Sequence, residues 1–466
     1  MNEPTYLTRR ELLWMAAAAT LLSGCGGGDE AGGPPTAAEP APSPTFTSPS
    51  VKLSGDLKIL MWSHFVPSHD KWFDPFAKDW GKQVGVNVTV DHINNTEIVA
   101  RTAAEIQARQ GHDLIQYIAP LSQFEPSVVD LKDVATEAAK RYGEQLALCV
   151  KSSQNRTTGK HYAYAPAWAP DPGNYRKSLW ESAGLANGPS TWDELLDGGA
   201  KIKKDKKVQM GLGMSQEIDS NMVGRALLWA FGSSVQDENE SVVINSTETV
   251  QAVEFMQHLF EQTMTNEVFS WNPASNNQGL IAGQLSYIVN SISAWRTAQA
   301  DNPDVADDIY FVRPLKGPKA ALHAQHVMYN WIVPSHARNV DAAKEFLLHY
   351  TANSAQVTYQ SKLYDLPAFP KLVPQLNGWL DKDPFGAKPA DKLAVLKNAS
   401  EWSVNVSHPG PENAAMGEVF STFIIPNMYA KAARGEMSPV EAVEDAERQI
   451  KPIFEKWRRR GLVGGG

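Results

Sequence analysis

The first part of the folded chain alternates short apolar stretches with amphipathic ones, and this order restricts the fold more than any other sequence feature. Three stretches have the apolar or alternating pattern of strands: Leu57–Trp62, Val86–Val90 and Asp113–Ile118. Between them, residues 72–80 and 96–110 carry apolar side chains at helical spacing, and Pro75 is expected in the first turn of its helix. This βαβαβ order predicts an α/β fold with a parallel sheet that has helices on both faces.

The alternation continues to the end of the chain. Thr191 and Ser438 each stand three residues before a glutamate, which is the capping-box pattern of a helix start. Further helices are expected over residues 248–264, 340–351 and 439–457, and further strands over 285–290, 309–312 and 327–334. The whole of the chain after residue 56 is therefore predicted to be mixed α/β.

The N-terminus has the composition of an export signal. Arg9 and Arg10 precede an apolar run, Leu12–Leu22, that spans roughly 16 Å as a helix, about half of a bilayer core. A charged start before a short apolar segment is typical of a signal peptide, and the paired arginines resemble the twin-arginine motif. Residues 1–24 are thus expected to be a Tat-like signal peptide, although a Sec signal can also carry two arginines. A cytosolic chain with a chance apolar start is the alternative.

The apolar run ends in a sequence that resembles a bacterial lipobox, with Cys25 as its cysteine. In that kind of signal the cysteine is lipidated and becomes the new N-terminus, so a lipid anchor is expected here. The next residues, 26–50, are rich in Gly and Pro, and residues 25–55 are predicted to form a flexible tether. The second cysteine, Cys149, lies in an apolar run and is expected to be buried and unreactive.

Composition and motifs argue against several classes of protein. The chain has 43 Lys and Arg against 52 Asp and Glu, a balance that argues against a nucleic-acid partner. No nucleophile elbow, phosphate loop, dinucleotide motif or HExxH motif is present, so neither a cofactor nor a metal is expected. The pairs His64/His69 and His323/His326 have no clear third ligand and are interpreted as structural. Two carboxylates that meet only in the fold, as in a glycoside hydrolase, stay open.

Two adjacent stretches carry a family resemblance. Residues 174–185 (NYRKSLWESAGL) and 189–195 (PSTWDEL) resemble a segment of the extracellular solute-binding proteins, family 1, of ABC transporters, which include maltose-binding protein. Residues 282–290, 330–335 and 341–347 resemble later strand and helix segments of that family. The resemblance covers about residues 56–458. Ser286 and Tyr287 replace a usual small-Met pair and Arg176 replaces a common Asn, which affects the ligand more than the fold.

The resemblance implies a two-lobed periplasmic-binding-protein fold of type II, with hinge strands between the lobes and a ligand enclosed by hinge closure. Lobe 1 is expected to hold residues 56–164 and 312–370. Lobe 2 is expected to hold residues 165–311 and 371–458, with 459–466 as a tail. The chain should cross between the lobes near Ala163–Ala167 and near Phe311–Pro314.

Candidate ligand-binding residues follow from strand ends, where cleft loops should lie. Aromatic rings pack on the apolar faces of sugars while polar groups bond to the hydroxyls. Six tryptophans and four other residues are placed there: Trp62, Trp168, Trp229, Trp271, Trp295 and Trp331, with His64, Tyr117, Asn290 and Arg296. Trp72, Trp80, Trp180 and Trp457 lie on helical apolar faces and are expected in the core.

The resulting hypothesis is a monomeric, lipid-anchored receptor at the bacterial cell envelope. It would capture a sugar or oligosaccharide and deliver it to the permease subunits of an ABC importer. One alternative is the same fold with a polyamine or another small solute as ligand, which a strongly acidic cleft would favour. The alternative of another class is an exported carbohydrate-active enzyme.

Overall fold

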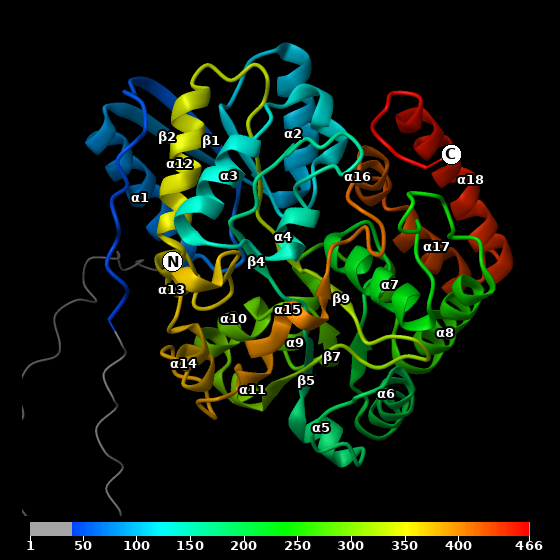
Figure 1. The fold of residues 1–466 in the computed structure, drawn as a ribbon. Helices are drawn as coiled ribbons and strands as arrows, with labels where there is room; N and C mark the ends of the chain where they lie inside the picture. The colour runs from blue at the N-terminus through cyan, green and yellow to red at the C-terminus, as the bar shows by residue number, and fades with distance from the viewer. Residues whose placement is uncertain (1–39, 466) are drawn as a thin grey trace, which may run out of the picture. The chain divides into compact units, whose positions relative to one another are not determined.

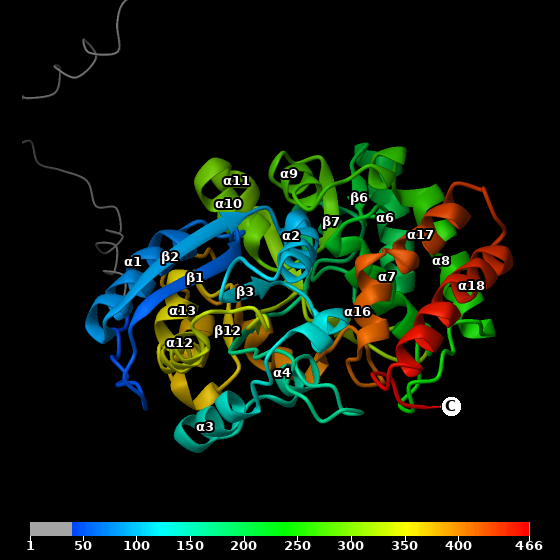
Figure 2. The ribbon, with the colours of Figure 1, turned by 90° about the horizontal axis from the view of Figure 1, so that it is seen from above.

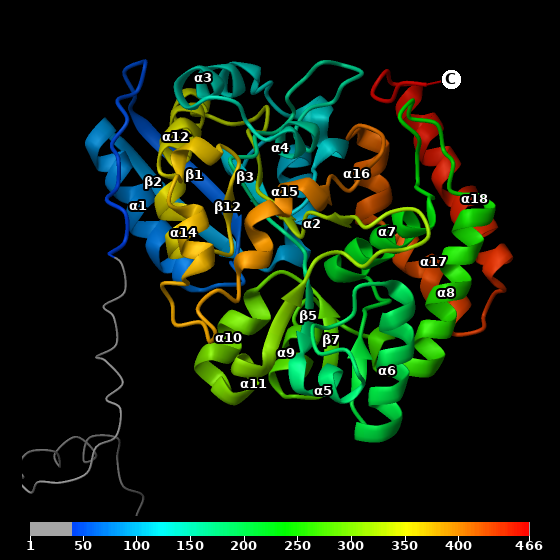
Figure 3. The same cartoon turned by 60° about the horizontal axis from the view of Figure 1, so that its bottom comes forward.

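Two four-stranded sheets, and a three-stranded sheet whose strands lead from one to the other, organise the chain (Figure 1). The computed structural model describes residues 40–465. Arg9, Arg10, Cys25 and the first part of the expected tether lie outside the described residues. Each four-stranded sheet carries its own helices, so the described part of the chain has two lobes, with β1 and β2 in one and β5 and β7 in the other (Figures 1 and 3).

The sheet of lobe 1 has the order β11-β3-β1-β2. Strand β1 pairs in parallel with both β2 and β3, with Leu57 opposite Val88 and Ile59 opposite Leu114. The predicted parallel βαβαβ unit is therefore confirmed, and β11 joins β3 in the antiparallel direction. The elements are β1 (Gly55–Trp62), α1 (Ser68–Val84), β2 (Val86–Ile93), α2 (Asn95–Ala108), β3 (Leu114–Tyr117), η1 (Ser122–Ser127), α3 (Lys132–Tyr142), α4 (Ala147–Lys151), β11 (Asn330–Ile332), α12 (Val340–Ala352) and α13 (Ser354–Gln360).

Aromatic packing fixes α1 and α12 beside the sheet of lobe 1. The ring of Phe73 on α1 lies 5.8 Å from that of Phe346 on α12 and 6.1 Å from that of Trp331 on β11. Helix α1 ends at Gly85, whose φ of 79° suits a residue without Cβ. Pro75 lies inside α1 and not in its first turn, because the helix already begins at Ser68. The expectation for Pro75 was therefore wrong.

The sheet of lobe 2 has the order β6-β7-β5-β8, and β5 runs antiparallel to both of its neighbours. Helices α16, α17 and α18 gather beside α7 and α8 at the far end of this lobe (Figure 2). The elements are β5 (Gly173–Arg176), α5 (Lys177–Ser182), α6 (Trp192–Lys206), β6 (Gln209–Gly211), α7 (Ile218–Phe231), α8 (Thr247–Thr263), η2 (Asn266–Phe269), α9 (Ser275–Ile281), β7 (Leu285–Val289), α10 (Ser293–Asp301), α11 (Pro303–Asp308), β8 (Ile309–Val312), α16 (Ala414–Ser421), α17 (Ile424–Ala433) and α18 (Pro439–Arg458).

The two predicted capping boxes begin helices, as expected. The side chain of Ser438 accepts a hydrogen bond from the backbone N–H of Glu441, whose carboxylate accepts one in return from the Ser438 N–H. The side chain of Thr191 likewise accepts a hydrogen bond from the backbone N–H of Glu194. The Glu194 carboxylate, however, accepts from the N–H of Ser190, at 2.7 Å. No helix within residues 40–465 has both the length and the apolar character that a membrane span needs.

The hinge sheet, β10-β4-β12, connects the lobes through three short antiparallel strands: β4 (Ala167–Ala169), β10 (Val327–Met328) and β12 (Leu366–Pro367). The second crossing lies further along the chain than the expected 311–314. After β8, the Lys316 N–H still bonds to Ser190 O of lobe 2, at 2.9 Å. The single strand expected over 327–334 is divided into β10 and β11, because the chain passes there from the hinge sheet to the sheet of lobe 1.

The chain after β12 forms short elements beside α10 and α11 of lobe 2. Arg296 on α10 forms an ion pair with Asp383, and the Lys392 ammonium donates to the carbonyl of Ala306 on α11. These elements are η3 (Pro370–Leu372), α14 (Leu376–Asp381), η4 (Ala394–Asn398), α15 (Ala399–Trp402) and β13 (Ser403–Val404), of which β13 pairs with β9 (His323–Ala324).

The last part of the expected tether contacts lobe 1. Residues 45–50, the strap, run along α12: the Thr45 N–H donates to Asn353 at 2.7 Å and the Ser50 N–H to Glu345 at 2.9 Å. The hydroxyl of Thr47 lies 3.0 Å from a ring nitrogen of His349. The prediction of a tether that reaches residue 55 therefore differs from the structure, because polar groups of α12 bind the strap.

We expect the strap to contribute to stability, in contrast to the residues before it. Deletion of residues 26–40 should leave Tm unchanged, whereas deletion of residues 26–50 should lower it by about 2–5 °C, because several hydrogen bonds to α12 are lost. Thermal unfolding of the two deletion variants, followed by circular dichroism, measures the difference. Equal Tm values would show that the strap adds nothing to lobe 1.

Candidate ligand-binding site

A cavity of about 230 Å³ lies between the two lobes. Lobe 1 contributes the first turn of α2 and the end of β3, and lobe 2 contributes the first turn of α7 and residues beside α16. Its walls include Asn95, Thr96, Tyr117, Glu217, Pro273 and Phe420. The carboxyl ends of parallel strands are where α/β sheets bind ligands, and Tyr117 ends β3 at such a position.

Four buried ionisable residues lie where the hinge meets lobe 2, and we call them the hinge cluster: Asp171, Glu217, Asp219 and His326. Asp171 follows β4, His326 precedes β10, and the two other residues begin α7. The His326 Nδ1 atom lies 3.1 Å from an oxygen of Asp171 and 3.6 Å from an oxygen of Asp219. Glu217 caps α7 by accepting the backbone N–H groups of Asp219 and Ser220, each at 2.6 Å.

Burial and mutual repulsion make the carboxyl groups of Glu217 and Asp219 hold their protons tightly. Burial raises the pKa of Glu217 to about 7, and burial together with the Glu217 charge raises the pKa of Asp219 well above its ordinary value. Burial alone would lower the pKa of His326, but the carboxylates of Asp171 and Asp219 raise it above its ordinary value. These two carboxylates thus favour the protonated form of the imidazole.

Aromatic rings adjoin the hinge cluster from the side of lobe 1. The ring of Phe65 lies 6.2 Å from that of His326 and 6.5 Å from that of Tyr364. Trp62 is the next ring in this direction, with its centroid 4.9 Å from that of Phe65. The site therefore combines ring surfaces, charged groups and a cavity that both lobes line.

Three of the predicted ligand-binding residues lie in or beside this region. Trp62 is buried at the end of β1 and stacks on His64, with 4.9 Å between ring centroids. His64 is buried and contacts the Tyr329 hydroxyl at 2.7 Å. Tyr117 is half-buried in the cavity wall, and burial raises its pKa to about 12.

Lobe 2 holds three further predicted residues, with Asn290 directly after β7 and Trp295 and Arg296 on α10. Asn290 donates to Asn277 at 2.5 Å and accepts from Asn174 through its carbonyl at 2.7 Å. Arg296 forms two bonds with Asp383, at 2.7 and 3.0 Å, and its guanidinium covers the ring of Trp295. Trp295 and Arg296 thus hold the segment after β12 on lobe 2.

The four remaining predicted tryptophans lie apart from the cavity walls. Trp331 packs between α1 and α12, and the indole N–H of Trp229 donates to His408 O at 2.9 Å. Trp168 is buried in the hinge strand β4. Trp271 is half-buried, and its carbonyl accepts from Ser215 at 2.8 Å. Ligand contact by these residues stays a prediction.

The residues that the sequence interpretation missed are Asp171, Glu217, Asp219 and Tyr364. Only one signal pointed to them: the His323/His326 pair, which was interpreted as structural. Asp171 and His326 meet across the hinge strands, and α7 contributes Asp219 from a different part of the chain. No sequence spacing encodes such a meeting, because it depends on the packing of the two lobes.

Within residues 40–465, one group of three side chains has the composition of a metal site: His64, His69 and Asp365. The Nδ1 atom of His64 accepts the backbone N–H of Val66 at 2.9 Å. The same Nδ1 atom lies 3.1 Å from the Val66 carbonyl, and Nε2 lies 2.7 Å from the Tyr329 hydroxyl and 3.3 Å from Asp365. Because both ring nitrogens of His64 already have partners within the protein, this arrangement favours a hydrogen-bonded network over a metal centre.

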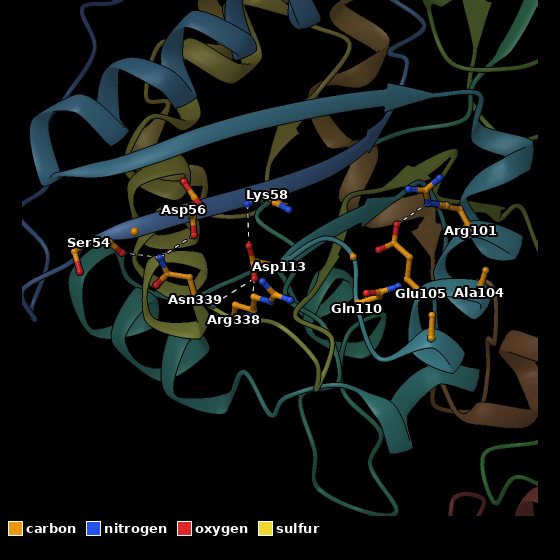
Figure 4. Close-up of a pocket in the computed structure, with 13 residues that line it drawn as sticks. Ser54, Asp56, Lys58, Arg101, Ala104, Glu105, Gln110, Asp113, Arg338 and Asn339 are labelled. Atoms are coloured by element: carbon orange, nitrogen blue, oxygen red, sulfur yellow. Dashed lines mark hydrogen bonds and ion pairs between the residues drawn. The ribbon is translucent and has the colours of Figure 1, made fainter.

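A larger surface cavity, of about 890 Å³, lies at the opposite, amino-terminal edge of the lobe 1 sheet (Figure 4). Its carboxylates already have partners. Asp113 accepts the backbone N–H groups of Lys58 and Arg338, at 2.9 and 2.6 Å, and Glu105 pairs with Arg101 at 2.6 Å. Because these groups are satisfied within lobe 1, the cavity between the lobes is the better candidate site.

Comparisons with known proteins agree with this arrangement. The family model of the bacterial extracellular solute-binding proteins matches residues 71–387. Proteins named as binding proteins in Brucella abortus and Brucella suis are 24% identical over 251 residues, which is 47% of this chain. The match spans 60% of the length of these relatives.

Solved structures share the fold at low sequence identity. A sugar transporter protein of Arthrobacter chlorophenolicus with bound laminaribiose has a TM-score of 0.72 at 16% identity, over 85% of this chain and 99% of that one. The maltose-bound MalE3 protein of T. maritima has a TM-score of 0.71 at 20% identity, over 86% of this chain and 100% of that one. The two-lobed α/β fold is therefore confirmed.

We expect the hinge cluster to make the unliganded protein less stable as the pH rises. Glu217, Asp219 and His326 all bind protons more tightly when folded, so each contributes stability that is complete below its unfolded pKa and is lost as the pH rises through its raised folded pKa, which for Glu217 is about 7. The variant Asp219→Asn lacks one of these groups. Its Tm relative to wild type should increase by a few degrees between pH 5 and pH 8.

The comparison of the two proteins removes the contribution of all groups that they share, including the buried Glu412, whose pKa burial also raises to about 7. Thermal unfolding at several pH values measures the effect. A Tm difference that stays constant from pH 5 to pH 8 would contradict the prediction.

Proposed function

The chain belongs to the bacterial extracellular solute-binding proteins, and from this premise we propose that it captures a sugar or oligosaccharide between its lobes for an ABC importer. The family consists of exported binding proteins, so the chain is a binding protein and not a carbohydrate-active enzyme. The permease subunits that would accept the ligand are proposed partners.

The cavity between the lobes is the observation that carries this proposal. Its walls come from both lobes, with Tyr117 on one side and Glu217 on the other, so a ligand there would contact both lobes and favour their closed arrangement. A site with this geometry couples ligand capture to a change of shape. A permease can then distinguish loaded receptors from empty ones.

A sugar is supported by the composition of the site and by the structural neighbours. Laminaribiose, maltose and tagatose are bound by proteins of the same fold. Rings of Trp62, Phe65, Tyr117 and Tyr364 surround the region, and such rings pack on the apolar faces of sugars. We propose Trp62, His64 and Tyr117 as the ligand contacts from lobe 1, and Asn290 as a polar contact from lobe 2.

We further propose that the protein is a monomer held at the bacterial membrane by a lipid on Cys25. The support is the lipobox-like sequence before Cys25 and the export signal with Arg9 and Arg10. The strap begins at Thr45, so residues 26–44 would separate the lipid from lobe 1. A tether of this length lets the site face the solvent while the protein remains near its permease.

A sugar that binds should raise Tm and compact the protein. Maltose, laminaribiose and D-glucosamine are the first probes, because a ligand that binds only the folded state stabilises it by mass action. Small-angle scattering with a stabilising probe should show a smaller radius of gyration than without it. An unchanged radius at saturation would contradict closure.

Tyr117→Ala should lower the affinity for such a probe by about 10- to 100-fold, because it removes a ring from the cavity wall. Trp457→Ala is the matched control, since Trp457 is buried on α18 and lies in lobe 2 away from the cavity. It should cost about 3–5 kcal/mol of the free energy of unfolding and leave affinity unchanged. Isothermal titration calorimetry and chemical denaturation separate the two effects. Equal affinities of Tyr117→Ala and wild type would exclude this cavity wall as the site.

Cys25→Ala should release the protein from membranes, because the proposed lipid has no other attachment point. Fractionation of cells that express either form, followed by immunoblotting, measures the distribution. If the variant remains with the membrane fraction after a high-salt wash, the anchor proposal is wrong.

A further inference from the structure

The hinge cluster has more negative than positive groups in a buried place. Asp171, Glu217 and Asp219 supply three carboxyl groups, and each is at most 6% exposed. Among the described residues, His326 is the one basic side chain that forms an ion pair with any of them. The nearby His323 does not supply a second cation, because burial lowers its pKa. A buried carboxylate needs a cation or hydrogen-bond donors beside it, and here the protein supplies one cation for three carboxyl groups.

Polar atoms beside the cluster also lack partners. One oxygen of Asp219 accepts from Asn276 at 2.7 Å, and the other faces the His326 Nδ1 atom at 3.6 Å without a hydrogen bond. The hydroxyls of Ser291 and Tyr364 are buried without hydrogen bonds of normal geometry. The ring of Tyr364 lies 6.3 Å from that of His326, and the N–H of Asn290, next to Ser291, donates to the carbonyl of Pro172, next to Asp171, at 3.3 Å. Both hydroxyl-bearing residues therefore adjoin the hinge cluster. Buried, unpaired groups of this number indicate a place that a polar ligand fills.

The surrounding rings suit a cation as well as a sugar. Tyr364 and Phe65 flank His326 at ring distances of 6.3 and 6.2 Å, so two ring surfaces already accommodate a positive group. Glu217 connects this place to the cavity, because it belongs both to the hinge cluster and to the cavity wall. Glu217 and Asp219 both lie at the start of α7, so a ligand at the Glu217 wall of the cavity would lie close to Asp219.

We propose that the ligand is a saccharide that carries a protonated amine, and that the ammonium group binds to Asp219 and Asp171. The proposal rests on the proposed function and specifies its substrate class. An ammonium offers three N–H donors, which can serve the carboxylate oxygens of Asp219 and Asp171 and the neighbouring hydroxyl oxygens. The positive charge of the ammonium offsets the excess of negative groups in the hinge cluster. In the unliganded protein a proton on the carboxyl groups takes the place of the ammonium. The amine therefore replaces a proton when it binds.

Calorimetric titration of the full chain with matched sugars tests the proposal. D-Glucosamine and chitobiose carry amines, N-acetyl-D-glucosamine and N,N′-diacetylchitobiose are their uncharged analogues, and glucose and cellobiose carry hydroxyls instead. At least one amine-bearing sugar should bind about tenfold or more tightly than its two uncharged analogues. Near pH 7, its binding should release protons, which two buffers of different ionisation enthalpy reveal. The uncharged sugars should release none.

Asp219→Asn should abolish both the preference for the amine and the proton release, while its side chain can still accept from Asn276. Asp171→Asn is the second variant and should weaken the preference. Glu412→Gln is the matched control: Glu412 is another buried carboxyl group, but its partners are Ser122 and Ser407, and it lies outside the hinge cluster. It should leave the preference unchanged. Circular dichroism verifies that each variant is folded.

The outcomes distinguish this proposal from the proposed function. Uncharged sugars that bind as tightly as the amines would overturn the proposal and leave sugar binding intact. Binding of spermidine with no binding of any saccharide would overturn the saccharide class. If no solute of the panel binds, both the proposal and the proposed sugar-binding function fail.

Discussion

The antiparallel pairing of β4, β10 and β12 is the constraint on which the rest of the structure depends. These strands are two or three residues long, yet they carry every passage between the lobes. Because β4 and β10 pair with Ala169 opposite Val327, the residues just beyond them, Asp171 and His326, must meet. Asp171 and His326 therefore flank the hinge strands and belong to the hinge cluster, so a ligand that contacted them would also contact the hinge.

The two lobes contribute different chemistry to the site. Lobe 2 supplies charge, because the first turn of α7 carries Glu217 and Asp219. Lobe 1 supplies ring surfaces from Phe65 and Tyr117. The carboxyl groups of the hinge cluster are buried, and unpaired charge is costly in such a place unless protons or a ligand neutralise it. The proposed ligand would therefore act where the two lobes meet the hinge.

The tryptophans that the sequence places at strand ends have different surroundings in the structure. Trp331 ends up between α1 and α12, Trp229 is bound to the loop after β13 through His408, and Trp295 lies under Arg296. A strand end in the sequence shows only that a side chain is near one edge of a sheet. Which neighbours fill the space around an indole depends on helices that come from distant parts of the chain, and a large ring gains most where it is fully enclosed.

The sequence by itself determined the local elements: the parallel βαβαβ unit of lobe 1, the helix starts at Thr191 and Ser438, and the family to which the chain belongs. These features depend on periodicity and capping, which act over a few residues. Only the tertiary structure decided where the chain crosses between the lobes, how the strap binds α12, and that Asp171, Asp219 and His326 form one buried cluster. The physical reason is that burial, unpaired charge and pKa shifts exist only after distant segments have packed together and excluded water.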